Sequence, residues 1–341
     1  MKTAQAAIDI INSKGGILGR PVQTIQCNDE SNPTRVGACL QQLIGGGAVF
    51  FLEFTGSPAV IQSKAIIQQL RIPTLAPNNA TASVPAPPNN DYIYTIGEST
   101  TAWGPVYCNG MQNAGIKTLA VLLDNSPTIA TFTPALLGAM DCVKSVNKQT
   151  APVNATDISA EIARLANPSA DAILISSASV GFEILAHNQI AQQFPKATVF
   201  DVATLCNSPT NWKLANPGTL VGSICMGSMD PNNPETQRVQ KLLQKSMGSS
   251  FQLDQFTAEA WDGVNMMNMA ITKAGTTDGP AVNAALQTLT NVTSAYGYKG
   301  FHLSLSATKH NAPDGPCGLV LVQYGPTNTQ QHPWDKFKPN C

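Results

Sequence analysis

Hydrophobic residues recur every three to four positions in several stretches of the chain, which is the spacing of one face of a helix. In the first stretch, residues 2–13, this face is formed by Ala6, Ala7, Ile10 and Ile11. Asn, Ser or Pro at the start of a segment and Gly at its end mark further helices. The predicted helices span residues 32–44, 105–114, 134–145, 159–165, 181–193, 235–247, 257–274 and 280–289, and another begins with Ser57 as its N-cap.

Short apolar or alternating runs between these helices predict strands. They span residues 22–27, 48–54, 72–76, 92–96, 118–123, 172–176, 198–202, 220–226 and 318–324. Because strands and helices alternate, we predict an α/β protein built on doubly wound parallel sheets.

Two segments rich in Pro and Asn, residues 83–90 and 230–234, interrupt this alternation. At about 150 residues per domain, a chain of 341 residues is expected to hold roughly two domains. We assign residues 1–97 and 230–300 to the first lobe, and residues 98–229 and 301–341 to the second. A ligand cleft is expected between the lobes.

The composition narrows the class of protein. With 43% hydrophobic and 12% charged residues, the chain is not expected to be disordered. A net charge of −1 gives no electrostatic reason to expect a nucleic acid or an anionic membrane as partner. No apolar run approaches the ~20 residues of a membrane span. The first residues lack the apolar core of a signal peptide, so an exported protein would have lost its signal.

The eight cysteines contain no C-x-x-C and no Cys/His group with zinc-site spacing, so no structural metal is predicted. An even number in a weakly charged chain favours an oxidising compartment. Sequence alone does not choose among the possible pairings, and several buried free thiols are an alternative. Nearest-neighbour pairing is our expectation: Cys27–Cys39, Cys108–Cys142, Cys206–Cys225 and Cys317–Cys341.

Motifs for common catalytic chemistry are missing from the sequence. No G-x-G-x-x-G follows a strand, and neither a phosphate-binding Walker loop nor a G-x-S-x-G nucleophile turn is present. The histidines are dispersed, and each is interpreted as a surface or satisfied core residue: His187, His302, His310 and His332. The methionines Met266, Met267 and Met269 are interpreted as core. We therefore predict neither an enzyme nor a cofactor.

Residues 6–33, AAIDIINSKGGILGRPVQTIQCNDESNP, carry a more specific signal. They match the pattern D-x-I-N-x-x-G-G-I-x-G, followed by a strand and an acidic loop that ends in Pro. Looser matches lie at residues 71–77, 156–165 and 258–275. Together these segments, over roughly residues 1–325, resemble the leucine/isoleucine/valine-binding-protein family of ABC-importer solute receptors. The resemblance implies the type I periplasmic-binding-protein fold, with two doubly wound parallel-sheet lobes joined by a multi-strand hinge.

One departure from the family concerns the first lobe. Members begin with a strand before the first helix, whereas this chain begins inside that helix. A missing central strand would leave backbone groups of both its neighbours unpaired. We therefore expect a truncated record rather than a natural deletion.

The resemblance implies a transport receptor. Its two lobes would close around a small solute, and a membrane permease of an ABC importer would recognise the closed form. Such a receptor would be a monomer in the periplasm or elsewhere outside the cytoplasm, and its precursor could carry a lipid anchor. A ligand-sensing regulatory domain of the same fold is the alternative, since fold does not fix function.

In the first lobe, Ser57 matches the family serine that binds the ligand carboxylate. It follows Gly56 at a predicted helix start, where free N–H groups and the helix dipole favour an anion. A plain N-cap is the alternative role for this serine. The loop formed by Asn78, Asn79, Ala80 and Thr81 follows the next strand, at the edge where open α/β sheets bind ligands. A turn is the alternative role for Thr81.

Two aromatic residues are further candidates for ligand contact, Trp103 at the entry to the second lobe and Phe54 after a strand of the first. The alternative is a core or hinge packing role for Trp103 and core packing for Phe54.

The second lobe departs from the amino-acid-binding pattern. The family's ligand-binding aromatic falls near Ala178 or Ser179, and its ammonium-binding glutamate near Thr204. We hypothesise a solute with a carboxylate or a neutral polar group, such as an aromatic or aliphatic acid, which need not carry an amino group. Asp124 or Asp201 could still serve an ammonium.

Overall fold

The computed structural model describes the chain apart from residues 31, 80, 167–168, 207–208, 327–330 and 340–341. It divides into two compact units, and the chain passes from one to the other after Thr100, Pro231 and Gly318. Unit 1 comprises Met1–Thr100 and Asn232–Gly318, and unit 2 comprises Thr101–Pro231 and Leu319–Cys341. Residues 301–318, which we had assigned to the second lobe, belong to unit 1, because β10 (His302–Leu303) pairs with β9 (Val292–Thr293) there.

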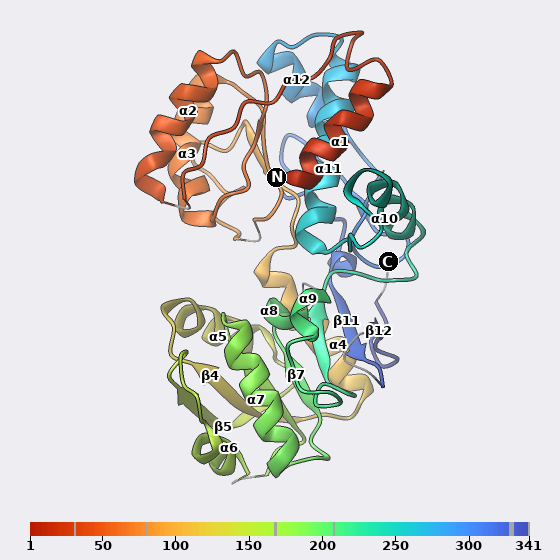
Figure 1. Cartoon of the computed structure of the whole chain (residues 1–341). Coiled ribbons are helices and arrows are strands. Elements are labelled where there is room, and N and C mark those ends of the chain that lie inside the picture. The colour runs from red at the N-terminus through yellow and green to blue at the C-terminus, as the bar shows by residue number, and fades with distance from the viewer. Residues whose placement is uncertain (31, 80, 167–168, 207–208, 327–330, 340–341) are drawn as a thin grey trace. The chain divides into compact units, whose positions relative to one another are not determined.

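Unit 1 is built on a short parallel sheet with the order β1-β2-β3. Its strands are β1 (Phe51–Leu52), β2 (Thr74–Ala76) and β3 (Ile93–Thr95). In Figure 1, α2 and α3 lie side by side next to this sheet, and α1 lies beside α11. The helices of the unit are α1 (Lys2–Ser13), α2 (Val36–Gly45), α3 (Ser57–Leu70), α10 (Pro234–Met247), α11 (Gln255–Ala274) and α12 (Gly279–Leu286).

The strand predicted over residues 22–27 is wrong. These residues are largely exposed and form no strand, because no neighbouring strand pairs with them. This segment is held at both ends. At its start, the backbone of Val22 forms hydrogen bonds of 2.7 and 2.9 Å with the Asn12 side chain, and at its end the Cys27–Cys39 disulfide links it to α2. Alternating hydrophobicity therefore identified a segment that could pair, but pairing also needs a partner.

Unit 2 holds a seven-stranded sheet with the order β12-β11-β8-β7-β6-β4-β5. The strands from β8 to β5 in this order are parallel, whereas β11 is antiparallel to both β8 and β12. Its strands are β4 (Thr118–Asp124), β5 (Lys144–Ala151), β6 (Ala172–Ser176), β7 (Val199–Asp201), β8 (Ile224–Gly227), β11 (Val320–Tyr324) and β12 (Gln331–Pro333). Its helices are α4 (Trp103–Asn113), α5 (Pro127–Ala139), α6 (Ser159–Leu165), α7 (Val180–Gln193), α8 (Ala203–Cys206) and α9 (Pro209–Trp212).

The predicted bounds of α1, α6 and β6 are confirmed to the residue, but the helix predicted over 134–145 is wrong. The helix instead begins at Pro127, after the N-cap Ser126, and Pro134 lies in its interior. Residues 144–151 form β5, an edge strand whose side chains are mostly exposed or half-buried. Such a strand lacks the apolar pattern by which strands were recognised.

Three of the predicted disulfides are confirmed, each within one unit. Their Cα–Cα distances are 5.4 Å for Cys27–Cys39, 5.6 Å for Cys108–Cys142 and 6.2 Å for Cys206–Cys225, all in the usual range. The fourth predicted pair, Cys317–Cys341, includes a residue outside the described part of the chain. None of the described helices has both the length and the apolar character of a membrane span.

Candidate functional site

The carboxyl edge of the unit 1 sheet gathers the polar residues that the sequence singled out. Because β1 and β2 are parallel, the segments that follow them lie at the same edge. Ser57 Oγ donates a hydrogen bond to Asn79 Oδ1 at 2.7 Å, and Thr81 Oγ1 donates to Ser57 Oγ at 2.9 Å. Asn79 Nδ2 donates to the Thr55 carbonyl at 3.2 Å. Ser57, Asn79 and Thr81 thus form one network, while Ala80 lies outside the described residues.

The prediction that Ser57 is the N-cap of its helix is wrong. Gly56 is the N-cap of α3, with extended backbone angles, and Ser57 is the first helical residue. The next residue, Pro58, has no N–H, and the amides of Ala59 and Val60 both donate to the Gly56 carbonyl. The hydroxyl of Ser57 is therefore directed to the neighbouring loop instead of to its own helix.

Two further oxygen atoms beside this network have no hydrogen-bond partner among the described residues. They are Thr55 Oγ1 and Asn78 Oδ1, and both are buried. An unpaired buried polar atom costs roughly 1–3 kcal/mol, so such atoms are rare in native proteins unless a ligand or water completes them. Gly56 and Phe54 lie on the same segment after β1, Phe54 half-buried. The segment thus combines paired and unpaired polar atoms.

Buried carboxyl groups lie behind this edge. A Cβ atom at Gly97 would lie 3.2 Å from the Asn79 carbonyl oxygen and 3.3 Å from Glu259 Oε1, so Glu259 is close to the loop. Burial raises the pKa of Glu259 well above its usual range. Burial likewise raises the pKa of Glu98 to about 8, although the Gly318 amide donates to its Oε1 at 3.0 Å. Glu98 is thus mainly uncharged at neutral pH, and burial likewise disfavours the negative charge of Glu259.

The carboxyl edge of the unit 2 sheet is organised by Asp124, the last residue of β4. Its Oδ1 accepts from the Ser126 amide at 2.7 Å, and its Oδ2 accepts from Ser177 Oγ at 2.6 Å and from the Ala178 amide at 2.8 Å. Burial alone would raise the pKa of Asp124, but these hydrogen bonds outweigh it and lower the pKa. Asp124 is therefore an ionised carboxylate that holds the loop after β6.

The candidates Ser179 and Thr204 belong to the same cluster. Thr204 Oγ1 donates to the Ser177 carbonyl at 2.7 Å, and Ser179 Oγ caps α7 by accepting from the Phe182 amide at 3.3 Å. The roles of Asp124 and Ser177 in this cluster were not predicted. Asp124, Ser126 and Pro127 lie directly after a buried strand, a spacing typical of a turn leading into a helix, so the sequence did contain a signal.

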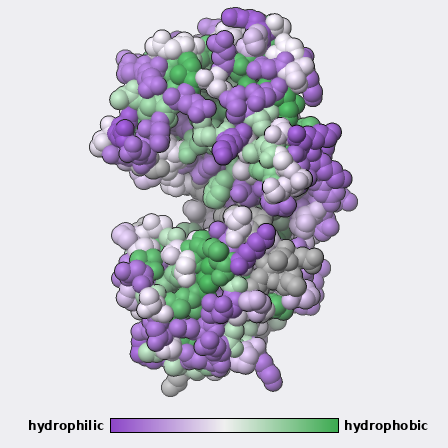
Figure 2. Space-filling model, in the orientation of Figure 1, coloured by the Kyte–Doolittle hydropathy of each residue, from purple (hydrophilic) through white to green (hydrophobic). Residues whose placement is uncertain are grey.

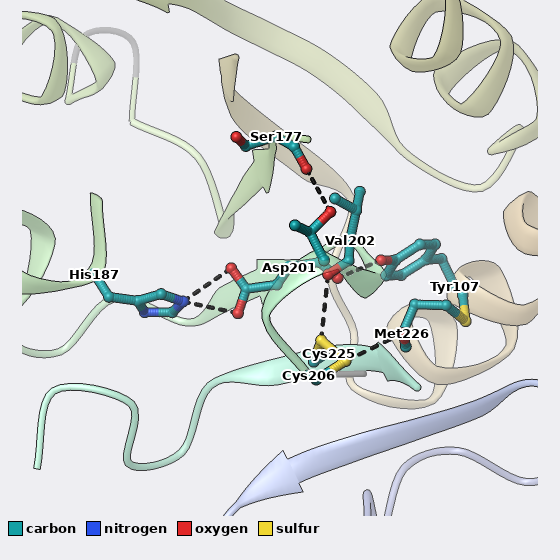
Figure 3. The surroundings of a disulfide bond; sticks show 9 residues. Tyr107, Ser177, His187, Asp201, Val202, Cys206, Cys225 and Met226 are labelled. Carbon is teal, nitrogen blue, oxygen red and sulfur yellow. Dashed lines mark hydrogen bonds and ion pairs between the residues drawn. A yellow bond between two sulfur atoms is a disulfide. The ribbon is translucent and has the colours of Figure 1, made fainter. Parts of the chain in front are cut away.

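Asp201, the last residue of β7, forms a buried hydrogen-bonded pair with His187 (Figure 3). Both of its carboxylate oxygens contact His187 Nε2, at 2.9 and 2.7 Å, and the two side chains are 0% and 1% exposed. Tyr107 donates its hydroxyl to the Asp201 carbonyl at 2.5 Å. The prediction of a satisfied core histidine is confirmed for His187. Met266 and Met267 are likewise buried as predicted, whereas Met269 is 41% exposed.

The Cys206–Cys225 disulfide joins the short helix after β7 to β8, near the His187–Asp201 pair (Figure 3). Cys225 Sγ lies 3.3 Å from the Val202 carbonyl oxygen, and Cys206 Sγ lies 3.2 Å from that of Met226. A disulfide sulfur has no proton to donate, so we describe both as close contacts. The disulfide anchors the segment that carries Thr204.

Trp103 adds an aromatic surface to unit 2. It begins α4, and since α4 precedes the parallel strand β4, its first residue lies at the carboxyl side of the sheet. The half-buried ring packs edge-to-face on Phe132 with a centroid distance of 5.3 Å. Trp103 Nε1 is buried and has no partner in the described part of the chain. Figure 2 shows hydrophobic residues gathered over the region of α5 and α8 in this unit.

Cavities of about 460, 370 and 210 Å³ lie elsewhere in the units. The largest is lined by α11 and the residues after α12, the second by the amino ends of β4 and β6, and the third by α1, α10 and α11. None of the three is lined by the polar residues described above.

A protein-family model and several solved structures each match nearly the whole chain. A family model described as periplasmic binding protein matches residues 1–322. No curated protein is similar enough in sequence to match.

Among solved structures, a periplasmic binding protein type 1 from Bordetella pertussis has a TM-score of 0.78 and 16% identity, with 97% of this chain and 94% of that chain covered. The branched-chain amino acid transporter substrate-binding protein LivJ from Streptococcus pneumoniae, solved with isoleucine, has a TM-score of 0.79, 15% identity and 97% and 91% coverage. A leucine-binding protein from Thermotoga maritima has a TM-score of 0.77, 14% identity and 98% and 93% coverage.

Proposed function

Because this chain belongs to the periplasmic binding protein family, we propose that it is a receptor outside the cytoplasm that captures a small carboxylate-bearing or polar solute for an ABC importer. Its fold is that of the type I periplasmic binding proteins. The similar structures named above are binding proteins, and one of them was solved with isoleucine. Identities of 13–16% support the fold, and the solute of this chain has to be argued from its own residues.

The network of Ser57, Asn79 and Thr81 carries the proposal. A carboxylate at the start of α3 would accept the Ser57 hydroxyl proton that Asn79 Oδ1 now accepts, and it would also lie near the Ser57 amide. The helix dipole favours a negative charge at this position. The segments after β1 and β2 carry two further hydroxyl groups, those of Thr55 and Thr81. The Thr55 hydroxyl has no partner among the described residues. The hydroxyl donors and the helix start together favour an anion at this position.

In this proposal the solute also contacts the carboxyl edge of unit 2. Trp103 would provide an aromatic surface and an unpaired N–H, and Ser179 and Thr204 would provide hydroxyl groups. Closing of the two units around the solute would give the permease a conformation to recognise. We do not propose that the protein converts the solute chemically.

Replacing Ser57 by Ala tests the carboxylate site. A thermal-shift and calorimetric panel of carboxylates, amino acids and amides first identifies a solute, which stabilises the protein by RT ln(1 + [L]/Kd). Ser57→Ala should then weaken binding of a carboxylate by about 10- to 100-fold, since a hydrogen bond to a charged group contributes roughly 1.5–3 kcal/mol. Thr272→Ala, an exposed hydroxyl on α11, is the control and should bind as the native chain does. Equal affinity of Ser57→Ala and the native protein would refute the site.

A further inference from the structure

We infer that the solute is a carboxylic acid with an uncharged, apolar remainder and no ammonium group. The inference rests on the proposed function and adds the chemical class of the solute. An ammonium group that leaves water needs a carboxylate or several acceptors in its place. We therefore followed every acidic side chain near the two carboxyl edges to its partners.

In unit 2, the first acidic group at the edge is Asp124. It is 2% exposed, and its two oxygens already accept from the Ser126 amide, the Ser177 hydroxyl and the Ala178 amide. Pairing with a solute would require breaking these hydrogen bonds and with them the loop that carries Ser179. Asp124 therefore shapes the edge and offers no free charge to a ligand.

The second acidic group, Asp201, is 0% exposed and faces His187 with both carboxylate oxygens (Figure 3). Glu183, one turn before His187 on α7, is also 0% exposed, and burial followed by the charge of Asp201 raises its pKa. Asp230, which follows β8, is 2% exposed and has interactions of its own. None of these three groups presents a carboxylate at the surface of unit 2.

Unit 1 is similar. Glu53 follows β1 and accepts from Ser63 Oγ at 3.0 Å, and burial raises its pKa to about 8. Glu30 is paired with Arg35 at 2.6 Å, and Asp29 has contacts of its own. Glu98 and Glu259 are buried, and burial raises the pKa of both. Two further acidic groups lie close to Glu259 on α11: Asp254 accepts from the Thr257 amide at 2.8 Å, and Asp262 is 1% exposed and accepts from Ser294 Oγ at 2.7 Å.

What the edges do offer fits an apolar acid. The donors of unit 1 suit one carboxylate, and the half-buried Trp103 ring of unit 2, packed edge-to-face on Phe132, gives an apolar ring surface. The ring of Trp103 could attract a cation, but a ring face without a carboxylate replaces only part of the hydration that a buried ammonium loses. An aliphatic or aromatic acid matches these donors and this ring surface, while Asn78 Oδ1, a single unpaired acceptor, is left to water and is too few for the three N–H groups of an ammonium.

Matched solute pairs test the inference on the full chain. Calorimetric titration would compare 4-methylpentanoate with leucine, and 3-phenylpropanoate with phenylalanine, because the members of each pair differ by the α-ammonium group alone. We expect the deaminated acid to bind at least about 100-fold more tightly in one or both pairs, the effect of an uncompensated buried charge. Titration of Ser57→Ala with the same acid should show the weaker binding described above.

The outcomes separate the two proposals. If leucine or phenylalanine binds as tightly as its deaminated partner and Ser57→Ala weakens that binding, the receptor function stands and the inference is overturned. If none of the four compounds binds, the apolar-acid assignment is overturned, and native mass spectrometry of solute retained through purification decides the receptor function separately. If the acids bind but Ser57→Ala does not weaken them, the carboxylate site is refuted while the solute class holds.

Discussion

Ser57 is the first residue of α3, and its hydroxyl donates to Asn79 on the loop after the next strand. A serine that capped its own helix would be bonded to an amide two or three residues ahead. The hydroxyl instead takes part in a network of side chains that a carboxylate can enter by exchange of one hydrogen bond. Its position at the helix start was readable from the sequence, but the direction of its hydroxyl depended on a loop 22 residues away.

Asp124 gives a test of how the unit 2 edge is held. In Asp124→Asn, one acceptor oxygen is replaced by an NH2 group, which faces either the Ser126 amide or the Ser177 hydroxyl and the Ala178 amide. We expect the free energy of unfolding to fall by about 2–4 kcal/mol, from lost hydrogen bonds to a charged group. Urea unfolding measures the change. Asp157→Asn, at an exposed carboxylate of the same unit, should cost far less, and equal losses would contradict this account.

Glu98 gives a prediction on pH. Burial raises its pKa in the folded protein to about 8, while the unfolded chain has the usual value of about 4.3. Between these values the unfolded chain releases a proton that the folded chain keeps. The stabilisation is therefore complete below about pH 4 and is lost as the pH rises toward 8.

Glu98→Gln removes this titration and keeps an acceptor oxygen for the Gly318 amide. The native chain should lose more stability than Glu98→Gln between pH 5 and pH 8, as measured by urea unfolding at both pH values. Glu30→Gln changes an exposed residue and serves as the control, whose pH dependence should match the native chain. Parallel pH curves for the native chain and Glu98→Gln would show that Glu98 is ionised when folded.

At the scale of elements, α5 shows how a proline can mislead. Pro134 was interpreted as a helix start, but the helix begins seven residues earlier, after Ser126 accepts from the Ile129 amide at 3.4 Å. A helix tolerates an interior proline when tertiary packing compensates for the missing N–H. Ile129 and Leu136 on this helix are buried in unit 2, which provides that packing.

Pro134→Ala should therefore stabilise the protein. The substitution restores one N–H to the helix at an exposed position, and helix propensity favours Ala over Pro by up to about 3 kcal/mol. The unfolded chain gains freedom, which offsets about 0.4–1 kcal/mol of this. We expect a rise of about 1–2 kcal/mol in the free energy of unfolding by urea titration. Pro127→Ala, at the first turn where proline is well tolerated, is the matched control and should not stabilise. A loss of stability in Pro134→Ala would mean that the ring itself is packed.

At the scale of the whole molecule, the chain visits each unit twice. Unit 1 is completed by residues 232–318, because α1 packs against α10 and α11, which come late in the sequence. Unit 2 is completed in the same way, because β11 pairs with β8. Neither unit is therefore formed by one continuous stretch of chain, and each holds its own core.

Hydrogen exchange tests the proposal at this scale. A carboxylate found in the panel should slow amide exchange at residues 57–60 in unit 1, and at residues 177–180 and 203–206 in unit 2. Ordering of both segments by one ligand is the physical reason. The exposed start of β5, residues 144–147, is the internal control and should exchange at an unchanged rate. Protection confined to one unit would contradict a solute that contacts both.

The sequence by itself determined the alternation of strands and helices, because apolar spacing and Pro, Ser and Gly at segment ends act over a few residues. It also placed the polar residues after β1 and β2, and the expectation of nearest-neighbour pairing, which the sequence alone did not require, is confirmed for three disulfides. Those signals are local, so the chain itself carries them.

Only the tertiary structure decided which alternating segment found a partner, so that residues 22–27 stayed unpaired while residues 144–151 became an edge strand. It also decided that Asp201 binds His187 and that Asp124 binds three donors, which leaves neither free for a ligand. Pairing, burial and charge compensation depend on groups far apart in the chain, and the fold brings them together.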